Sequence, residues 1–248
     1  MDSLWFFIIV GFFAQLVDGA LGMAYGVTSN SLLLTLGVSP AISSASVHFA
    51  EIFTTLVSGV SHLKLGNVDK LLFKKLLVPG IVGGVLGAYI LTQIPSGILK
   101  PIIAVYLALM GVRILLKVFG KGTVNREVFV RKRHFYVLGL IGGFFDAMGG
   151  GGWGPIVTTT LVADGKNPRK TIGSVNAAEF FVTIAEVIAF LALLSQFNWF
   201  VILGLIIGGC VAAPIAALVT SKINPKMLMI ILGILIIGLS LRTILLTF

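Results

Sequence analysis

The chain has 248 residues, of which 57% are hydrophobic and only 11% are charged, and its mean hydropathy is +1.08. Soluble domains carry about a quarter charged residues, so this composition excludes an ordinary soluble protein and predicts a membrane protein. The net charge of +9 comes from short basic clusters between apolar segments. That pattern is typical of cytoplasmic loops and not of a nucleic-acid-binding surface.

Eight apolar blocks follow one another along the chain, and we expect each to be helical, which gives an all-α polytopic membrane protein. The blocks are approximately residues 4–36, 40–63, 76–91, 98–118, 135–163, 171–194, 199–219 and 227–248. The first residues lack the basic stretch of a cleaved signal, so we expect the first block to be retained. The one cysteine, Cys210, excludes an intrachain disulfide.

The two halves of the chain resemble each other. The offset that places Gly11 on Gly139 also places Asp18 on Asp146 without a gap. It further aligns Gly22 with Gly150, Gly26 with Gly154, Pro40 with Pro168, Glu51 with Glu179, and Thr55 with Thr183. We therefore expect a first repeat over residues 1–118, a basic cytoplasmic linker over 119–134, and a second repeat over 135–248.

The charges of the loops predict how the repeats are oriented. Loops near residues 64–75, 117–133, 166–170 and 222–226 are basic. The loops of the other half that are equivalent to 64–75, 166–170 and 222–226 are neutral. Because basic loops stay on the cytoplasmic side, this alternation predicts two inverted four-segment repeats. Block 135–163 begins after one basic loop and ends before another, so it must enter and leave on the same side. We expect each repeat to begin with a helical hairpin that is broken at glycines.

The hairpin tips, residues 18–26 and 146–154, are the predicted binding site for an anion. Helices broken inside a membrane present free N–H groups and a positive dipole end to an anion. The candidate substrate-binding residues are Gly22, Gly26, Asn30, Gly150, Gly151, Gly152, Gly154, Thr158 and Thr159. The alternative is that the glycines only allow close helix packing. That alternative is preferred for Gly83, Gly84, Gly87, Gly208 and Gly209. The acids at the breaks, Asp18 and Asp146, either act in function or only cap freed N–H groups.

A polar stripe follows each hairpin along the next helix. In the first half it includes His48, Glu51 and Thr55, and in the second half Asn176, Glu179, Thr183 and Glu186. A charged side chain that faces lipid would cost at least ~2.5 kcal/mol, so the stripe must face the bundle interior. The residues proposed for proton coupling, or for a polar stripe, are His48, Glu51, Thr55, Asn176, Glu179 and Thr183. The alternative role for the glutamates is hydrogen bonding between helices.

No cofactor and no metal site is predicted, because His48, His62 and His134 are too scattered for ligand spacing and no nucleotide-binding loop is present. Arg113 and Arg242 lie near the ends of the last helix of each half, where we expect them to reach toward the headgroups.

The chain resembles the TauE/SafE family of sulfite and organosulfonate exporters. The resemblance rests on the glycine-rich hairpins with their small polar arms, on the pairs Gly37/Pro40 and Gly165/Pro168, and on the doubled four-block layout. The first hairpin departs from the pattern, with Leu21, Met23 and Ala24 where glycines are typical. The resemblance implies a cell-membrane transporter of a small sulfur-containing anion.

Two functions are therefore compared. The leading interpretation is a secondary transporter, an exporter of an anion such as sulfite or an organosulfonate, whose partners are the anion and the lipid bilayer. The alternative is a non-transporting membrane subunit or an intramembrane enzyme, although no nucleophile–base arrangement can be assembled. The sequence leaves open the direction of transport, the coupling ion and the oligomeric state, with a homodimer among the possible assemblies.

Overall fold

The structure is a computed structural model that describes residues 4–21, 23–119, 132–164, 166–220 and 225–246. Within these residues every regular element is helical, as the sequence predicts. The elements are α1 (Leu4–Leu21), α2 (Tyr25–Thr35), α3 (Pro40–Lys64), α4 (Lys70–Gln93), α5 (Ser96–Phe119), α6 (Lys132–Gly149), the π-helical turn η1 (Gly154–Thr158), α7 (Thr159–Ala163), α8 (Pro168–Leu193), α9 (Trp199–Thr220) and α10 (Pro225–Leu245). Most of the predicted linker, and the basic residue Lys222, lie outside the described residues.

Each of the eight apolar blocks corresponds to one long helix or, for the first block of each half, to two helices separated by a break. Asn167 caps α8, because its side chain accepts a hydrogen bond from the Lys170 N–H at 3.2 Å. Ser39 precedes α3 with an extended backbone but makes no side-chain cap hydrogen bond, so only the proline that follows it marks this helix start.

Three helices are long and apolar enough to cross a bilayer, namely residues 70–93, 96–118 and 169–193. Shorter apolar helices cover 4–18, 199–212 and 229–245. Large hydrophobic side chains lie exposed along the outer helices, for example Val78 and Leu86 on α4 and Leu109 on α5. A soluble protein could not expose so much apolar surface to water, so these faces are suited to lipid.

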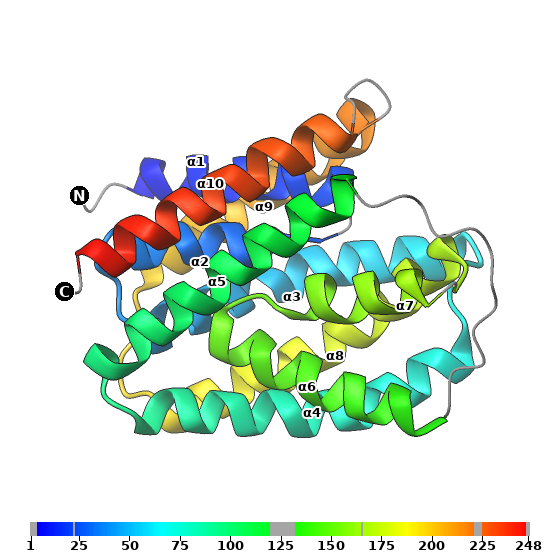
Figure 1. Ribbon diagram of the computed structural model, residues 1–248, viewed down its shortest axis with the longest axis horizontal. Coiled ribbons are helices and arrows are strands. Elements are labelled where there is room, and N and C mark those ends of the chain that lie inside the picture. Colours follow the sequence, from blue (N-terminus) through cyan, green and yellow to red (C-terminus); the bar gives the residue numbers. More distant parts are fainter. Residues whose placement is uncertain (1–3, 22, 120–131, 165, 221–224, 247–248) are drawn as a thin grey trace.

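The helices form one bundle in which α3 and α8 pack against each other near the middle (Figure 1). Helix α1 packs on α9, and α6 packs on α4. Helices α5 and α10 lie side by side and run in opposite directions, as their colours show in Figure 1. Each long helix of one half thus finds its main partner in the other half, so the two halves form a single unit.

Glycines bring the outer helices close to their partners. A Cβ atom on Gly83 of α4 would overlap the backbone carbonyl oxygen of Leu140 on α6, and one on Gly208 of α9 would overlap that of Ile8 on α1. Close helix packing, the interpretation preferred for these two glycines, therefore agrees with the structure. Gly84 differs, because a Cβ there would overlap the side chain of Glu186.

We expect Gly83→Ala to destabilise the bundle by about 1–3 kcal/mol, since the added methyl group forces α4 and α6 apart. Gly238→Ala is the matched control, because a Cβ atom on Gly238 of α10 meets nothing within 4 Å. That change should be neutral or should stabilise the helix by up to ~1 kcal/mol. Thermal unfolding in detergent measures both, and equal melting temperatures for the two variants would contradict the packing that the structure describes.

Candidate functional site

A narrow cavity lies where the two helix breaks meet the polar faces of α3 and α8. Its enclosed volume is about 20 Å³, which is room for about one water molecule. It is lined by Asp18, Met23, Ala24, Tyr25, Gly26, Val27, Glu51, Thr54, Thr55, Ser58, Asp146, Gly151, Gly152, Gly154, Pro155, Asn176 and Glu179. Both halves of the chain therefore contribute to one site.

The first break separates α1 from α2. Ala24 precedes α2 with a φ angle of 112°, a left-handed backbone that costs a non-glycine residue roughly 1–2 kcal/mol. Asp18 Oδ1 accepts a hydrogen bond of 3.2 Å from the Tyr25 N–H, the first N–H of α2. The Tyr25 hydroxyl donates to the Leu205 carbonyl of α9 at 3.0 Å. The start of α2 is thus held in place from two sides.

The second break separates α6 from η1 and is held by one carboxylate. Asp146 Oδ1 accepts hydrogen bonds from the N–H groups of Gly152 at 2.6 Å and Trp153 at 2.9 Å. Gly150 and Gly151 have φ angles of 63° and 141°, values that residues other than glycine rarely adopt. The buried Trp153 ring donates its Nε1–H to the Val175 carbonyl of α8 at 3.1 Å, which anchors the break to α8.

The two breaks touch each other. A Cβ atom on Gly26 would overlap the carbonyl oxygen of Gly150, and one on Gly151 would overlap the backbone of Gly26. The Asn30 side chain of α2 donates to the Gly149 carbonyl and accepts from the Ser43 hydroxyl. Glycine at these positions is therefore required for contact between the breaks, and a large side chain at Gly151 would disrupt the fold as well as fill the cavity.

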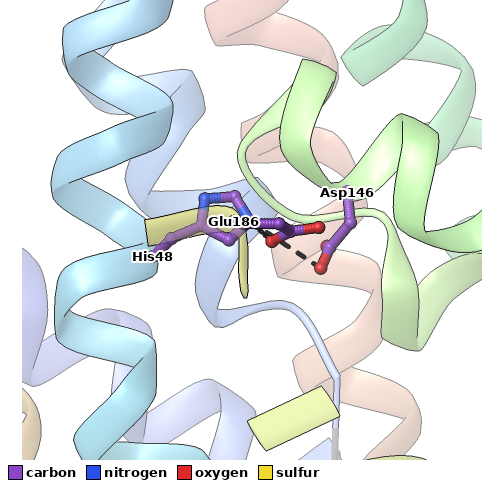
Figure 2. A group of neighbouring side chains, drawn as sticks. All are labelled: His48, Asp146 and Glu186. Atoms are coloured by element: carbon purple, nitrogen blue, oxygen red, sulfur yellow. Dashed lines mark ion pairs between the residues drawn. The ribbon is translucent and has the colours of Figure 1, made fainter. Parts of the chain in front are cut away.

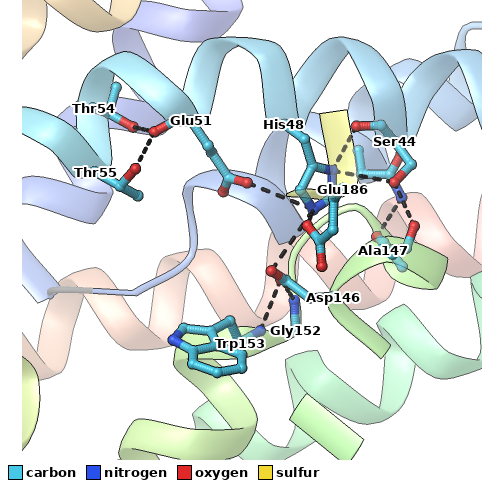
Figure 3. A network of polar contacts seen from close by, with 12 residues as sticks. Ser44, His48, Glu51, Thr54, Thr55, Asp146, Ala147, Gly152, Trp153 and Glu186 are labelled. Carbon is cyan, nitrogen blue, oxygen red and sulfur yellow. Dashed lines mark hydrogen bonds and ion pairs between the residues drawn. The ribbon is translucent and has the colours of Figure 1, made fainter. Parts of the chain in front are cut away.

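Four carboxylates line the cavity, namely Asp18, Glu51, Asp146 and Glu179, and none of the described residues that line it is lysine or arginine. Oε2 of Glu51 is buried and has no hydrogen-bond partner among the described residues. Figure 3 shows the Glu51 side chain directed toward His48, while the hydroxyls of Thr54 and Thr55 donate to the Glu51 backbone carbonyl. So many negative charges repel one another strongly in a low-dielectric interior.

A second acidic residue of α8 lies deeper than the cavity. Glu186 is fully buried, and its Oε2 lies 2.8 Å from Nε2 of His48 on α3 (Figure 2). The same nitrogen lies 3.7 Å from Asp146 Oδ2 and 3.9 Å from Glu51 Oε2. His48 is thus surrounded by carboxylates from α3, α6 and α8.

The structure brings together ten of the predicted site residues in the cavity: Asp18, Gly26, Glu51, Thr55, Asp146, Gly151, Gly152, Gly154, Asn176 and Glu179. Asn176 also donates to the Ser58 hydroxyl at 2.7 Å, which links α8 to α3. Other predicted residues do not line the cavity: Asn30, His48, Gly150, Thr158 and Thr183 are all buried elsewhere in the bundle. Gly22 lies outside the described residues.

Thr159 has other partners in the structure. Its hydroxyl donates to the Pro155 carbonyl and accepts from Nε of Arg113 at 3.0 Å, while Arg113 Nη2 donates to Thr160 at 2.7 Å. The guanidinium of Arg113 therefore binds the start of α7, which the sequence interpretation did not anticipate. The sequence places Glu186 in the polar stripe but not among the candidate coupling residues, and the equivalent residue of the first half is Ser58.

Comparison with known proteins decides the family. The family model described as "Sulfite exporter TauE/SafE" matches residues 7–243. The chain belongs to the TauE/SafE family. It is also 43% identical to a Bacillus subtilis (strain 168) protein named "Probable membrane transporter protein YtnM" over 249 residues, which is 98% of this chain and 83% of that protein. No solved structure matches the chain. A membrane transporter is what both the family and the B. subtilis relative indicate, and the helical fold with its exposed apolar side chains is consistent with this. The chain is a membrane transporter of the TauE/SafE family.

We expect Asp146→Ala to lower the free energy of unfolding more than Asp18→Ala does. Asp146 accepts two backbone N–H groups in the buried second break, whereas Asp18 accepts one in the first. A buried N–H group that loses its acceptor costs about 1–3 kcal/mol. Asp146→Asn should lower the free energy of unfolding less than Asp146→Ala, because the amide oxygen of asparagine can still accept hydrogen bonds from the two N–H groups. Thermal unfolding in detergent ranks the three variants, and a larger loss for Asp18→Ala would contradict this account of the breaks.

Proposed function

We propose that this TauE/SafE transporter is a secondary carrier that exports a small sulfur-containing anion, such as sulfite or an organosulfonate, across the cell membrane. The observation that carries the proposal is the cavity that both helix breaks line, at equivalent positions of the two halves. The anion binds between the breaks, near the middle of the membrane. The family's description as a sulfite exporter supports both the substrate and the direction.

The donors for the anion come from the start of α2. Tyr25, Gly26 and Val27 line the cavity and are the first residues of this 11-residue helix. The first N–H groups of a helix have no partner within it, and the helix dipole places positive charge there. The Tyr25 N–H already binds Asp18, so the N–H groups of Gly26 and Val27 are those that we assign to the anion. Because the cavity holds only about 20 Å³, the breaks must move apart to admit it.

The acids of the cavity make proton coupling a physical requirement of this proposal. An anion that approaches Asp18, Glu51, Asp146 and Glu179 as four carboxylates would be repelled, and no lining lysine or arginine compensates. Asp18 and Asp146 already accept backbone N–H groups at the two breaks, so we assign them to holding the breaks. Glu51 and Glu179 are therefore the groups that we assign to bind protons when the anion binds. If fewer protons move with the anion than it has negative charges, the transported net charge is negative. The negative potential of the cell interior then drives the anion outward.

Alternating access follows from inverted repeats, which we propose for this chain. The packing of α1 on α9 matches that of α6 on α4, as a two-fold axis relating the halves requires. Each half begins with a helix that is broken at an aspartate and glycines, so each repeat contributes one arm of the binding site. Rocking of one half against the other around this site would expose it to each side of the membrane in turn.

Cysteine labelling tests the inverted repeats. In a Cys210→Ser background we expect Val38→Cys and Arg169→Cys to react with membrane-impermeant maleimide from opposite sides of the membrane. Val38 lies in the loop before α3, and Arg169 lies in the first turn of α8, directly after the equivalent loop. Only the second of these two regions is basic. Cys210→Ser alone is the unlabelled control. Reaction of both cysteines from one side would exclude inverted repeats.

The double variant Glu51→Gln/Glu179→Gln tests whether protons are coupled to the anion. Anion binding and transport are measured for this variant and for the unmodified protein. For the unmodified protein we expect affinity for sulfite or a small sulfonate to fall as pH rises, by up to about tenfold per pH unit for each linked proton. The sign follows because loss of a proton restores repulsion between carboxylate and anion. Glutamine mimics the protonated acid, so the double variant should transport in proteoliposomes with a flatter pH profile than the unmodified protein, because it loses the two protons that these glutamates bind.

Asp69→Asn is the matched control, because Asp69 caps α4 outside the cavity and its oxygen can still accept from Leu71 and Leu72. This variant should keep the pH profile of the unmodified protein. An unchanged profile in Glu51→Gln/Glu179→Gln would remove both glutamates from the coupling mechanism. Absence of sulfite and sulfonate transport by the unmodified protein would remove the substrate assignment.

A further inference from the structure

His48 of α3 has a hydrogen-bond arrangement that fixes where its ring protons are. Its Nδ1 lies 2.7 Å from the backbone carbonyl oxygen of Ser44, one turn earlier in the same helix. A carbonyl oxygen can only accept, so Nδ1 must carry the hydrogen of this bond. In the neutral ring the other nitrogen, Nε2, is then a bare acceptor.

That bare acceptor faces a carboxylate oxygen. Nε2 lies 2.8 Å from Oε2 of Glu186, which is an ion-pair distance, and both side chains are completely buried. Neither atom has any other hydrogen-bond partner among the described residues. Two lone pairs at this distance repel each other unless a hydrogen lies between them. Either the imidazole is protonated beside a carboxylate, or the carboxylic acid donates to a neutral imidazole, and in both cases the pair holds one proton that backbone hydrogen bonds do not supply.

We propose that His48 and Glu186 form a dyad that binds one transported proton between Nε2 and Oε2, as a site separate from the glutamates that line the cavity. The role of this proton in transport rests on the proposed function. The existence of the shared proton does not, because it follows from the tautomer of His48 and from the 2.8 Å distance between Nε2 and Oε2 of Glu186. The ligand is a single proton.

The surroundings of the dyad make its proton sensitive to the occupant of the cavity. Glu51 of α3 and Asp146 of α6 face Nε2 at 3.9 and 3.7 Å, and both also line the cavity. Asp18 of α1 and Glu179 of α8 add two further acids at the cavity. With its proton the dyad has no net charge. Without the proton it adds a negative charge beside Asp146, whose Oδ2 has no hydrogen-bond partner among the described residues.

This geometry links the dyad to the anion. A negative substrate in the cavity raises the free energy of every nearby carboxylate and therefore favours the protonated dyad. Release of the anion removes that effect, and Glu51 and Asp146 are the nearest groups that could accept the proton on its way to the cavity. Gly84 of α4 leaves the space that Glu186 occupies, since a Cβ there would overlap the carboxylate.

Nitrogen-15 NMR of histidine-labelled protein tests the dyad directly. The chain has three histidines, so His62→Gln/His134→Gln leaves the signal of His48 alone. In detergent we expect a protonated Nδ1 at every pH studied and an Nε2 signal shifted by the shared proton. Glu186→Gln should remove the titration of that proton, because an amide N–H then donates permanently to Nε2. Glu186→Asp, which keeps the charge but withdraws the carboxylate from Nε2, provides a second variant if the first does not fold.

The surface pair of His134 and Asp164 supplies a matched control. Its Nε2–Oδ2 distance is 3.0 Å, but the two side chains are 40% and 28% exposed. Asp164→Asn, in a protein that retains His134, should leave the His48 signal and the pH dependence of transport unchanged. A second readout is proton uptake when sulfite is added to weakly buffered protein, which Glu186→Gln should reduce and Asp164→Asn should not.

The results separate the dyad from the proposed function. A His48 signal that shows no hydrogen-bonded Nε2, or that titrates alike in Glu186→Gln and its parent, overturns the dyad whatever is transported. A shared proton that disappears in Glu186→Gln supports the dyad as a proton site. If proton uptake upon sulfite addition is absent while that NMR result holds, the anion or its coupling in the proposed function is wrong and the dyad stands.

Discussion

The requirement that most shapes this protein is that broken helices inside a bilayer must satisfy their own N–H groups. Lipid offers no hydrogen bonds, and each unsatisfied buried group costs several kcal/mol. The chain meets the requirement with an aspartate at each break: Asp18 accepts from Tyr25, and Asp146 accepts from Gly152 and Trp153. Placing these acids in the interior brings negative charge to the centre of the bundle, and the rest of the site has to accommodate that charge.

Few positive side chains lie near these acids to balance their negative charge. No lysine or arginine among the described residues reaches the cavity, and His48 is the one basic side chain that we find among Asp146, Glu51 and Glu186. Carboxylates held so close in a low dielectric cannot all be charged at once, so protons become part of the site. In the proposed function the anion therefore binds together with protons, because protonation relieves the repulsion between the carboxylates and the anion.

The arginines of α5 and α10 act at a distance from this acidic centre. Arg113 of the first half donates to Thr159 and Thr160 at the start of α7, and Arg242 of the second half reaches the Thr35 carbonyl at the end of α2 at 3.5 Å. Each arginine thus binds the short helix that follows the break of the other half. These contacts tie the parts that move in the proposed mechanism to α5 and α10, which pack against each other.

The sequence alone determined the class of protein and the positions of its helices. Long apolar blocks can be stable only in lipid, and the glycines and prolines between them end helices by local backbone chemistry, so eight blocks and two breaks were readable without coordinates. The polar stripe was readable too, because a helical period places His48, Glu51 and Thr55 on one face. These signals are local, and each depends on residues a few positions apart.

The tertiary structure alone decided which polar groups meet. Whether Asn30 bonds to Gly149, whether Arg113 binds Thr159, and whether His48 faces Glu186 depend on how α2, α3, α5, α6 and α8 cross, and their partners are separated by tens of residues or more. The sequence did not place Glu186 among the candidate coupling residues, and the internal repeat gives it a serine as its counterpart, but the packing of α3 on α8 places it against the one buried histidine. A repeat can predict which positions are equivalent, but only the contacts between the helices determine the charge that each side chain meets.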